Sequence, residues 1–382
     1  MVARPITVVQ MLPGLEGGGV ERGTLETGAY LTERGHRSIV ISGGGRLVGP
    51  LERQGSRHLK WRVGEKTPVC LMYLPALRRL LLRENVDILH LRSRLPAWVG
   101  YLAWRSLPPN RRPKLVTTFH GFYSVNAYSA IMTRGERVIA ISEIIRTHIR
   151  ERYDIPDDRI VVIHRGMDHS YFDPERITDD RLASLRSRWG LSDTDAQRPL
   201  IMLPGRITRL KGHDVFINSL ARIRHLDWHG ICVGDTDENP GYVAELTALI
   251  SRVGLEKRIT FARYCDDMPA ALMLADIAVS ATSGTPEAFG RIAIEAQAMG
   301  TPVVASAHGG SLETLLNGKT GWLVEPGDAQ AMADALAGAI SDAPMREAFG
   351  RQGREWVRER FTVEKMCGET LDLYQQLLQG FQ

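Results

Sequence analysis

Short apolar runs rich in Val, Ile and Leu alternate along the chain with longer stretches in which apolar residues recur at helical spacing. This alternation is typical of α/β units, in which buried parallel strands are followed by covering helices. The first half predicts strands at residues 6–12, 37–42, 87–91, 114–119, 137–141 and 159–163. The second half predicts strands at residues 200–204, 229–233, 258–261, 276–280, 302–305 and 321–324.

The same rhythm thus occurs twice, on either side of an irregular, charged region. The chain has 382 residues, which exceeds the length at which a single hydrophobic core keeps growing. We therefore predict two Rossmann-like domains, residues 1–168 and 169–362, that face each other across a cleft. The pattern from about 343 to 379 is helical, apart from a loop at Phe361-Thr362, and the final helix (363–382) is expected to pack back on the first domain.

Composition indicates a globular protein. Hydrophobic residues at 43% and charged residues at 24% are ordinary values, and no apolar run approaches the ~18 residues that span a bilayer. The N-terminus enters an apolar strand segment without the features of a secretion signal. The four cysteines are scattered, with no Cys-x-x-Cys pair. We therefore expect a cytoplasmic protein with neither a disulfide framework nor a zinc site.

The net charge of +4 hides an uneven distribution. Residues 1–168 contain 26 Lys and Arg against 15 Asp and Glu, a net charge of +11, whereas the remaining residues contain 22 against 29, a net charge of −7. An anionic partner of the N-terminal half would explain this split. Arg-rich helices that cover their own domain would explain it equally well.

Two glutamates stand eight positions apart where the irregular stretch Gly284-Thr285-Pro286-Glu287-Ala288-Phe289-Gly290 gives way to an apolar helix pattern. The turn residues place Glu287 in a loop at the mouth of the helix and Glu295 about two turns inside it. The amides of Phe289, Gly290 and Arg291 are expected to be free first-turn donors, which suit a phosphate or sugar oxygen. Taken alone, such a pair is more often a helix cap and a solvated helix residue.

A glycine-rich turn follows the first predicted strand and includes Gly18 and Gly19. Strand, glycine turn and helix in this order let the backbone approach a phosphate closely. The spacing is not Gly-x-Gly-x-x-Gly, so it does not indicate a dinucleotide fingerprint, and a plain flexible turn is nearly as good an interpretation.

Three further residues end or follow predicted strands. Arg206 and Lys211 stand five positions apart around a turn, where a guanidinium fork and an ammonium can bracket a diphosphate. His120 ends a strand and precedes a glycine, which places it at the mouth of the predicted cleft. Cations at strand ends are common, so Arg206 and Lys211 by themselves are a weak signal.

Two acidic loops, Asp235-Thr236-Asp237 and Asp193-Thr194-Asp195, have the side chains of a divalent-metal site. Short acidic pairs in loops are usually solvated, and the eleven histidines show no metal-ligand spacing. We therefore predict that the protein binds no metal and needs no cofactor.

Together these motifs resemble the retaining, nucleotide-sugar-dependent glycosyltransferases of family four, which have the GT-B fold. The resemblance extends over almost the whole chain through the early glycine loop, Phe119-His120-Gly121, Ala140-Ile141-Ser142, Arg165-Gly166-Met167-Asp168, Gly205-Arg206 with Lys211-Gly212, Pro286 through Ala296, Gly309-Gly310 and Gly321-Trp322-Leu323-Val324. The segment from Pro286 to Ala296 is the most specific of these motifs.

The resemblance implies a role for each candidate residue. Arg206 and Lys211 would hold the donor diphosphate, which Gly18 and Gly19 would approach from the other domain. Glu295 would hold the ribose hydroxyls. Glu287 and His120 would contact the donor sugar, and the donor-binding segment would continue through Ala288, Phe289, Gly290 and Arg291.

Two departures from the family pattern concern the site. Arg165-Gly166-Met167-Asp168 stands where the family usually has Asn-Gly-Val-Asp, which could alter the hinge or the acceptor side. Arg291 replaces an apolar residue of many members and could reach a donor substituent or phosphate. The identity of the sugar therefore stays open.

The resemblance implies retention with front-face attack assisted by the departing phosphate, and cations with helix N-termini would stabilise the leaving nucleoside diphosphate without a metal. One alternative is a nucleotide-sugar epimerase or a phosphorylase with the same two-domain fold. Another is a non-catalytic nucleic-acid-binding protein that uses the basic half, although no recognition motif supports it.

The basic half also suggests where the acceptor lies. Arg78, Arg79 and Arg83 follow Leu71-Met72-Tyr73-Leu74, and Arg94, Trp98, Tyr101, Trp104 and Arg105 come after them. Basic residues with aromatic residues at helical spacing can rest on an anionic membrane surface, although packing on the sheet explains the tryptophans better. A glycan or lipid-linked acceptor at the inner membrane would supply the anionic partner. We therefore expect a peripheral glycosyltransferase of lipopolysaccharide or exopolysaccharide assembly that binds a nucleoside diphosphate sugar and no nucleic acid.

Overall fold

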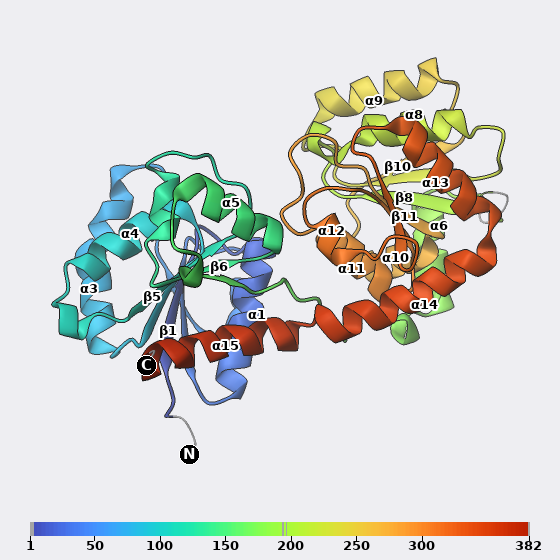
Figure 1. Ribbon diagram of the computed structural model, residues 1–382. Helices are drawn as coiled ribbons and strands as arrows, with labels where there is room; N and C mark the ends of the chain where they lie inside the picture. The colour runs from blue at the N-terminus through green and yellow to red at the C-terminus, as the bar shows by residue number, and fades with distance from the viewer. Residues whose placement is uncertain (1–3, 193–194, 196, 381–382) are drawn as a thin grey trace. The chain divides into compact units, whose positions relative to one another are not determined.

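The computed structural model describes residues 4–192, 195 and 197–380 (Figure 1). The chain divides into two compact units: Met1–Gly166 together with Val363–Gln382, and Met167–Thr362. The division lies two residues before the expected boundary after Asp168, and the C-terminal helix belongs to the first unit. Each unit contains one sheet in which all paired strands are parallel.

The sheet of the N-terminal unit has seven strands in the order β3-β2-β1-β4-β5-β6-β7. Their bounds are β1 (Thr7–Met11), β2 (Arg37–Ser42), β3 (Arg57–Lys60), β4 (Ile88–Leu91), β5 (Lys114–Phe119), β6 (Arg137–Ala140) and β7 (Ile160–Val162). β3 is a four-residue edge strand that was not predicted from the sequence. Its residues Arg-His-Leu-Lys contain a single apolar side chain, so the sequence has no apolar run that would indicate a strand here.

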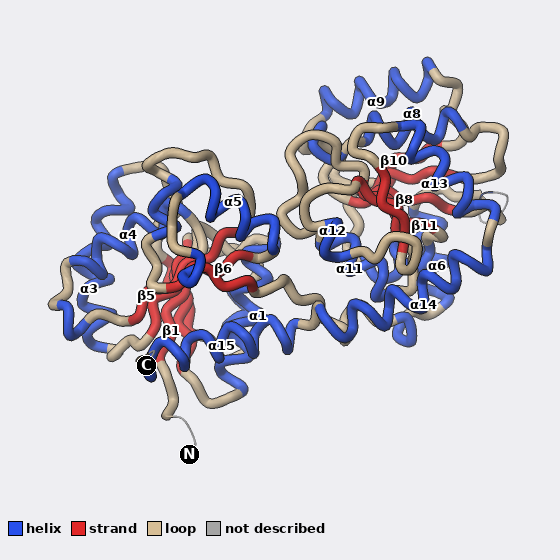
Figure 2. Tube along the Cα trace, in the orientation of Figure 1, coloured by secondary structure: helices blue, strands red, loops and turns tan. Residues whose placement is uncertain are grey.

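Helices cover both faces of this sheet (Figure 2). They are α1 (Gly19–Glu33), α2 (Val48–Arg53), α3 (Leu74–Arg83), α4 (Arg94–Arg105), α5 (Glu143–Tyr153) and α15 (Val363–Gln379), with 3-10 turns that include η1 (Pro68–Tyr73), η3 (Ser129–Thr133) and η4 (Asp157–Arg159). The apolar face of α15 packs with the buried strand residues Ile88 and Val116 through Met366 and Tyr374. The C-terminal helix is therefore part of the core of the first unit.

The sheet of the C-terminal unit has six strands in the order β10-β9-β8-β11-β12-β13. Their bounds are β8 (Leu200–Pro204), β9 (His229–Val233), β10 (Ile259–Ala262), β11 (Ile277–Ser280), β12 (Val303–Ser306) and β13 (Gly321–Val324). The strand order reverses between β8 and β11, which is the kind of switch point where ligands of doubly wound sheets bind.

The helices of this unit are α6 (Asp179–Arg188), α8 (His213–Arg222), α9 (Pro240–Arg252), α10 (Met268–Leu274), α11 (Arg291–Ala298), α12 (Ser311–Thr314), α13 (Ala329–Ser341) and α14 (Ala343–Arg360), with the 3-10 turns η5 (Pro174–Arg176) and η6 (Arg209–Lys211). The expected loop at Phe361-Thr362 separates α14 from α15. Within the described chain, no helix is long and apolar enough to cross a membrane.

Candidate active site

The loop that carries Glu287 connects β11 to α11 and is held by close backbone packing. The amide of Gly310 donates a hydrogen bond of 2.8 Å to the carbonyl of Glu287. A side chain at Gly309 would clash with that same carbonyl, and one at Gly310 would clash with the backbone of Phe289. Because only glycines allow this approach, the Gly309-Gly310 turn fixes the position of the Glu287 loop.

The Nζ of Lys211 forms an ion pair with the Oε1 of Glu287, and Thr282 lies 3.4 Å from the same oxygen. Lys211 ends η6, after β8. The next residue, Gly212, has φ +67° and lies so close to the carbonyl of Ala281 that a side chain would clash with it. The side chains of Lys211 and Glu287 keep only 24% and 16% of their surface exposed. Two residues 76 positions apart in the sequence therefore form one partly buried charge pair at the carboxyl ends of β8 and β11.

Arg206 follows Gly205 just after the end of β8, and it is exposed. It has neither a hydrogen bond nor an ion pair with any residue that the structure describes. The preceding Gly205 has φ +139°, a conformation that turns the chain out of the strand. Arg206 is thus an uncommitted cation at the carboxyl edge of the sheet.

Helix α11 begins later than the sequence analysis expected. Gly290, with φ +80°, precedes its first residue, Arg291, so Glu295 lies about one turn inside the helix and not two. Phe289 is correspondingly a buried loop residue and not a first-turn donor. The left-handed conformation of Gly290 delays the helix, and sequence periodicity does not reveal that conformation. Ala288 lies in the same loop with intermediate exposure.

Arg291 and Glu295 form an ion pair one turn apart on α11. The Nε and an Nη of Arg291 each lie 3.1 Å from the Oε1 of Glu295. The side chains are 20% and 11% exposed. Arg291 therefore holds the carboxylate of Glu295 in one orientation, one turn inside the helix.

His308 is a candidate that the sequence analysis missed. It lies in the loop after β12, directly before Gly309, and both ring nitrogens are buried without a hydrogen-bond partner among the described residues. Burial lowers the pKa of His308, although the carboxylates of Glu287 and Glu325 act in the opposite direction. Its place after a predicted strand and before a glycine pair is the same signal that singled out His120.

In the N-terminal unit, Gly18 and Gly19 begin helix α1. Gly18 is the N-cap, and the carboxylate of Glu21 lies beside it in the first turn. The buried Arg165 donates a hydrogen bond to the carbonyl of Gly19 and packs against Gly23, where any side chain would clash with the guanidinium. The departure at Arg165 therefore adds a buried positive charge beneath the glycine turn.

His120 directly follows β5, and both of its ring nitrogens are buried. Burial lowers the pKa of His120 well below its ordinary value, and the nearby charges of Arg165 and Arg92 lower it further. Arg92 is itself only 4% exposed and donates to the hydroxyls of Thr24 and Thr27 on α1. His120 is therefore neutral near pH 7, so its ring can donate one hydrogen bond and accept another.

The acidic loops form no metal cluster in the described part of the chain, where no three His, Cys, Asp or Glu residues are grouped as ligands. The carboxylate of Asp235 accepts the amide of Asp237 at 2.9 Å. Asp195 accepts bonds from Ser192 and lies 3.2 Å from His229. Asp193 and Thr194, which belong to the second candidate loop, lie outside the described residues.

Comparison with known proteins agrees with this architecture. Residues 17–171 match the Glycosyltransferase Family 4 domain, and residues 192–356 match the domain described as Glycosyl transferases group 1. A glycosyltransferase from Rickettsia africae is 34% identical, and its crystal structure aligns over 99% of this chain and 100% of that chain with a TM-score of 0.90. The chain belongs to the group 1 glycosyltransferases.

Other relatives of this glycosyltransferase differ in the reactions that their names state. N-acetyl-alpha-D-glucosaminyl L-malate synthase of Bacillus anthracis is 25% identical over 96% of this chain and 95% of its own. D-inositol 3-phosphate glycosyltransferase of Xylanimonas cellulosilytica is 32% identical, but the match covers 63% of this chain and 58% of that protein. The Anabaena protein HepE, crystallised with UDP and glucose, is 22% identical and aligns over 97% and 100% of the two chains with a TM-score of 0.81. The fold is GT-B.

The structure thus places the predicted site residues in several separate groups. Lys211 and Glu287 form one pair, and Arg291 and Glu295 form another. Gly18, Gly19 and His120 belong to the N-terminal unit, where the buried guanidinium groups of Arg92 and Arg165 contribute positive charge.

Proposed function

We propose that this glycosyltransferase moves a hexosyl group from a nucleoside diphosphate sugar to a glycan or lipid-linked acceptor, with retention of the anomeric configuration. The observation that carries the proposal is the Lys211–Glu287 pair, held in place by Gly309-Gly310 at the switch point of the C-terminal sheet. A cation and a carboxylate in such a position match the two unlike ends of a sugar diphosphate, because one end is anionic and the other carries hydroxyl donors.

In the proposed mode of binding, Lys211 and Arg206 hold the diphosphate. Glu287 accepts hydrogen bonds from hydroxyls of the donor sugar, and Glu295, oriented by Arg291, accepts those of the ribose. The Lys211–Glu287 ion pair sets the cation and the carboxylate side by side before the donor arrives, which reduces the reorganisation that binding requires. Gly18 and Gly19 approach the diphosphate with their backbone.

In the chemical step, the bond between the anomeric carbon and the diphosphate oxygen breaks, and negative charge develops on that oxygen. Arg206 and Lys211 stabilise this charge more strongly than they stabilise the ground state, so they lower the barrier. The neutral ring of His120 contacts a sugar hydroxyl without repelling the positive charge that develops on the sugar. The acceptor hydroxyl attacks from the same face, and its proton passes to the leaving phosphate. No metal or other cofactor takes part in this proposal.

A thermal-shift screen with uridine, guanosine and adenosine diphosphate sugars identifies the donor, because a specific ligand stabilises the protein by mass action. Transfer to an acceptor, followed by NMR of the new anomeric centre, then tests the reaction. An α-product from an α-donor supports the proposal. Inversion would overturn the retaining mechanism, and epimer formation or phosphate-dependent cleavage would show the alternative enzyme classes.

The acceptor is proposed to be anionic. The names of two relatives state malate and inositol 3-phosphate, both of which are anions, and the N-terminal half here has a net charge of +11 from 26 basic and 15 acidic residues. A lipid-linked precursor of lipopolysaccharide or exopolysaccharide at the cytoplasmic face of the inner membrane would likewise be an anion. We propose peripheral association with that surface. Parallel assays with soluble and lipid-linked acceptors separate the two acceptor classes.

A further inference from the structure

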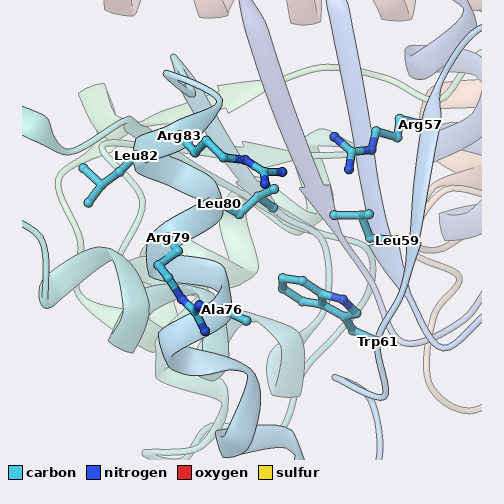
Figure 3. Close-up of a pocket in the computed structure, with 8 residues that line it drawn as sticks. All are labelled: Arg57, Leu59, Trp61, Ala76, Arg79, Leu80, Leu82 and Arg83. Atoms are coloured by element: carbon cyan, nitrogen blue, oxygen red, sulfur yellow. The ribbon is translucent and has the colours of Figure 1, made fainter.

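An open groove of about 600 Å³ lies at one edge of the N-terminal sheet, between the edge strand β3 and helix α3. Leu59 and Leu80 line its floor, and Trp61 closes one end (Figure 3). The guanidinium groups of Arg57 and Arg83 point toward one another from the two sides, as Figure 3 shows. The groove thus combines an apolar floor with cationic walls.

The positive charge of the groove exceeds the negative charge that accompanies it. Arg37, Arg57 and Arg83 all pair with one carboxylate, that of Glu84. Hydrogen bonds from Arg37 and Arg83 lower the pKa of Glu84 to about 2, so it stays ionised. Arg79, which also lines the groove, has only the carbonyl of Pro75 as a partner in the described structure. The groove therefore keeps net positive charge, and among the described residues Arg79 has no acidic partner.

Next to the groove, η1 exposes an unusual set of aliphatic side chains. Val69, Leu71 and Met72 are 39%, 47% and 75% exposed. Tyr73, at the end of η1, stacks on Trp61 of the groove with ring centroids 5.3 Å apart. Single exposed apolar residues are ordinary, but a group that adjoins a cationic groove marks a surface that meets an apolar partner.

We infer that η1 and the groove form the surface through which the N-terminal unit docks on an anionic lipid bilayer. This inference rests on the membrane association proposed above and assigns its location. Leu71 and Met72 insert between lipid head groups, while Arg57, Arg79 and Arg83 bind lipid phosphates at the level of the interface. Burial of aliphatic side chains and attraction to anionic lipid are the two terms that hold interfacial segments on membranes.

The side chains favour a lipid surface over a nucleic acid. Nucleic-acid surfaces stack bases on exposed aromatic rings, whereas here the exposed residues are aliphatic and Trp61 is already stacked on Tyr73. The opposite edge of the same sheet, at β7, provides a comparison within the unit. Arg150 and Arg152 of α5 are exposed there on a helix that packs against β6 and β7.

Co-sedimentation with vesicles tests the charge component, using the full chain, vesicles that contain phosphatidylglycerol and vesicles of phosphatidylcholine alone. The double variant Arg79→Gln/Arg83→Gln should bind anionic vesicles about tenfold more weakly than the wild type, since each basic residue near such a surface contributes to binding. The matched control, Arg150→Gln/Arg152→Gln, removes the same charge at the other sheet edge and should bind within about twofold of the wild type. Equal losses in both variants would show a diffuse charge effect and overturn the assigned location.

Insertion of η1 has a separate readout, because the four native cysteines are all buried. Met72→Cys labelled with an environment-sensitive fluorophore should shift to the blue with anionic vesicles, and Asp158→Cys, on η4 at the β7 edge, should not. Leu71→Ser/Met72→Ser should abolish sedimentation while thermal stability stays unchanged. No shift at Met72, or sedimentation of the Leu71→Ser/Met72→Ser variant at the wild-type level, would overturn insertion.

Sugar transfer to a soluble acceptor, or slow donor hydrolysis, is measured on the same variants without vesicles. Unchanged turnover with lost sedimentation supports the docking surface. If the wild type transfers sugar but does not sediment with vesicles, the docking surface is refuted and the proposed function is not. If it sediments with vesicles but shows no turnover, the proposed function is refuted and the docking surface is not. Millimolar inorganic phosphate should leave vesicle binding unchanged at constant ionic strength, and full displacement would show a free-phosphate site instead.

Discussion

At the scale of single residues, the C-terminal unit separates two carboxylates by their partners. Glu287 is paired with a lysine from another strand end, whereas Glu295 is paired with an arginine on its own helix. Each carboxylate thus has a cationic partner in the free protein, and the two partners differ in type and in their place in the fold. The two acids therefore need not act alike, despite their position in one motif.

The proposed roles predict different outcomes for Glu287→Gln and Glu295→Gln. If Glu295 holds the ribose, Glu295→Gln weakens both the free nucleoside diphosphate and the donor by about tenfold or more, the effect of losing hydrogen bonds to a charged group. If Glu287 holds the sugar, Glu287→Gln lowers turnover by about 100-fold and leaves nucleoside diphosphate affinity nearly intact. Calorimetry with both ligands and steady-state kinetics check this. Equal losses of nucleoside diphosphate affinity in the two variants would show that the assignment is wrong.

At the scale of elements, helix α1 is shaped by the guanidinium groups that pack on it. Arg92 donates to Thr24 and Thr27, and Arg165 occupies the space beside Gly23. A glycine inside a helix normally costs stability relative to alanine. Here the glycine makes room for a charged side chain that would otherwise have no place in the core of the unit.

This arrangement predicts opposite effects for two glycine substitutions in helices. Gly23→Ala should destabilise the protein by about 1–3 kcal/mol through overpacking against Arg165. Gly338→Ala, in α13, has no neighbouring atom within 4 Å of the new methyl group and should be neutral or stabilising by up to about 1 kcal/mol. Urea denaturation of both variants measures the difference. Adding Arg165→Met should restore part of the stability lost in Gly23→Ala. If the free-energy loss of the double variant equals or exceeds the sum of the losses in the two single variants, the contact is contradicted.

Helix α8 predicts a pH dependence of stability. Its first residue, His213, is fully buried, and burial lowers its pKa from 6.5 to about 4. The unfolded chain binds this proton below pH 6.5 while the folded protein does not. The free energy of unfolding therefore falls as pH decreases from about 6.5 to about 4, by about 3 kcal/mol for this group. Denaturation curves at several pH values measure the slope. In His213→Gln the slope over this range should decrease, and an unchanged slope would exclude His213 as its source.

The sequence predicted most elements because their signals are local. All twelve predicted strands are present, since buried parallel strands are continuous apolar runs. β3 was missed because an edge strand of Arg57 to Lys60 needs few apolar residues. The start of α11 was predicted too early because the left-handed Gly290 delays the helix, and the apolar pattern does not record a backbone angle.

At the scale of the whole molecule, what the sequence could not show is which distant side chains meet. The Lys211–Glu287 pair joins loops that follow different strands, and the Arg165 contact with Gly19 joins residues 146 positions apart. Motif spacing named these residues without pairing them. Arg57, by contrast, carried no motif, and its place in a cationic groove depends on β3 and α3 lying side by side. Pairings of this kind follow from topology, so local patterns alone cannot predict them.

The last prediction is that turnover does not require a divalent metal, because positive charges from several elements are proposed to neutralise the leaving diphosphate. A metal in such reactions neutralises the leaving diphosphate, and here Lys211, the uncommitted Arg206 and the N-terminal end of α11 are proposed to supply that charge. Excess EDTA should therefore leave the rate of nucleoside diphosphate release unchanged within error. Arg206→Gln should lower this rate by about 100-fold or more, and added Mg²⁺ should not restore it. Complete loss of activity in EDTA that is recovered by Mg²⁺ or Mn²⁺ would contradict the proposal and make the Asp235/Asp237 loop the first place to test for a metal, by substitution of Asp235 with Asn.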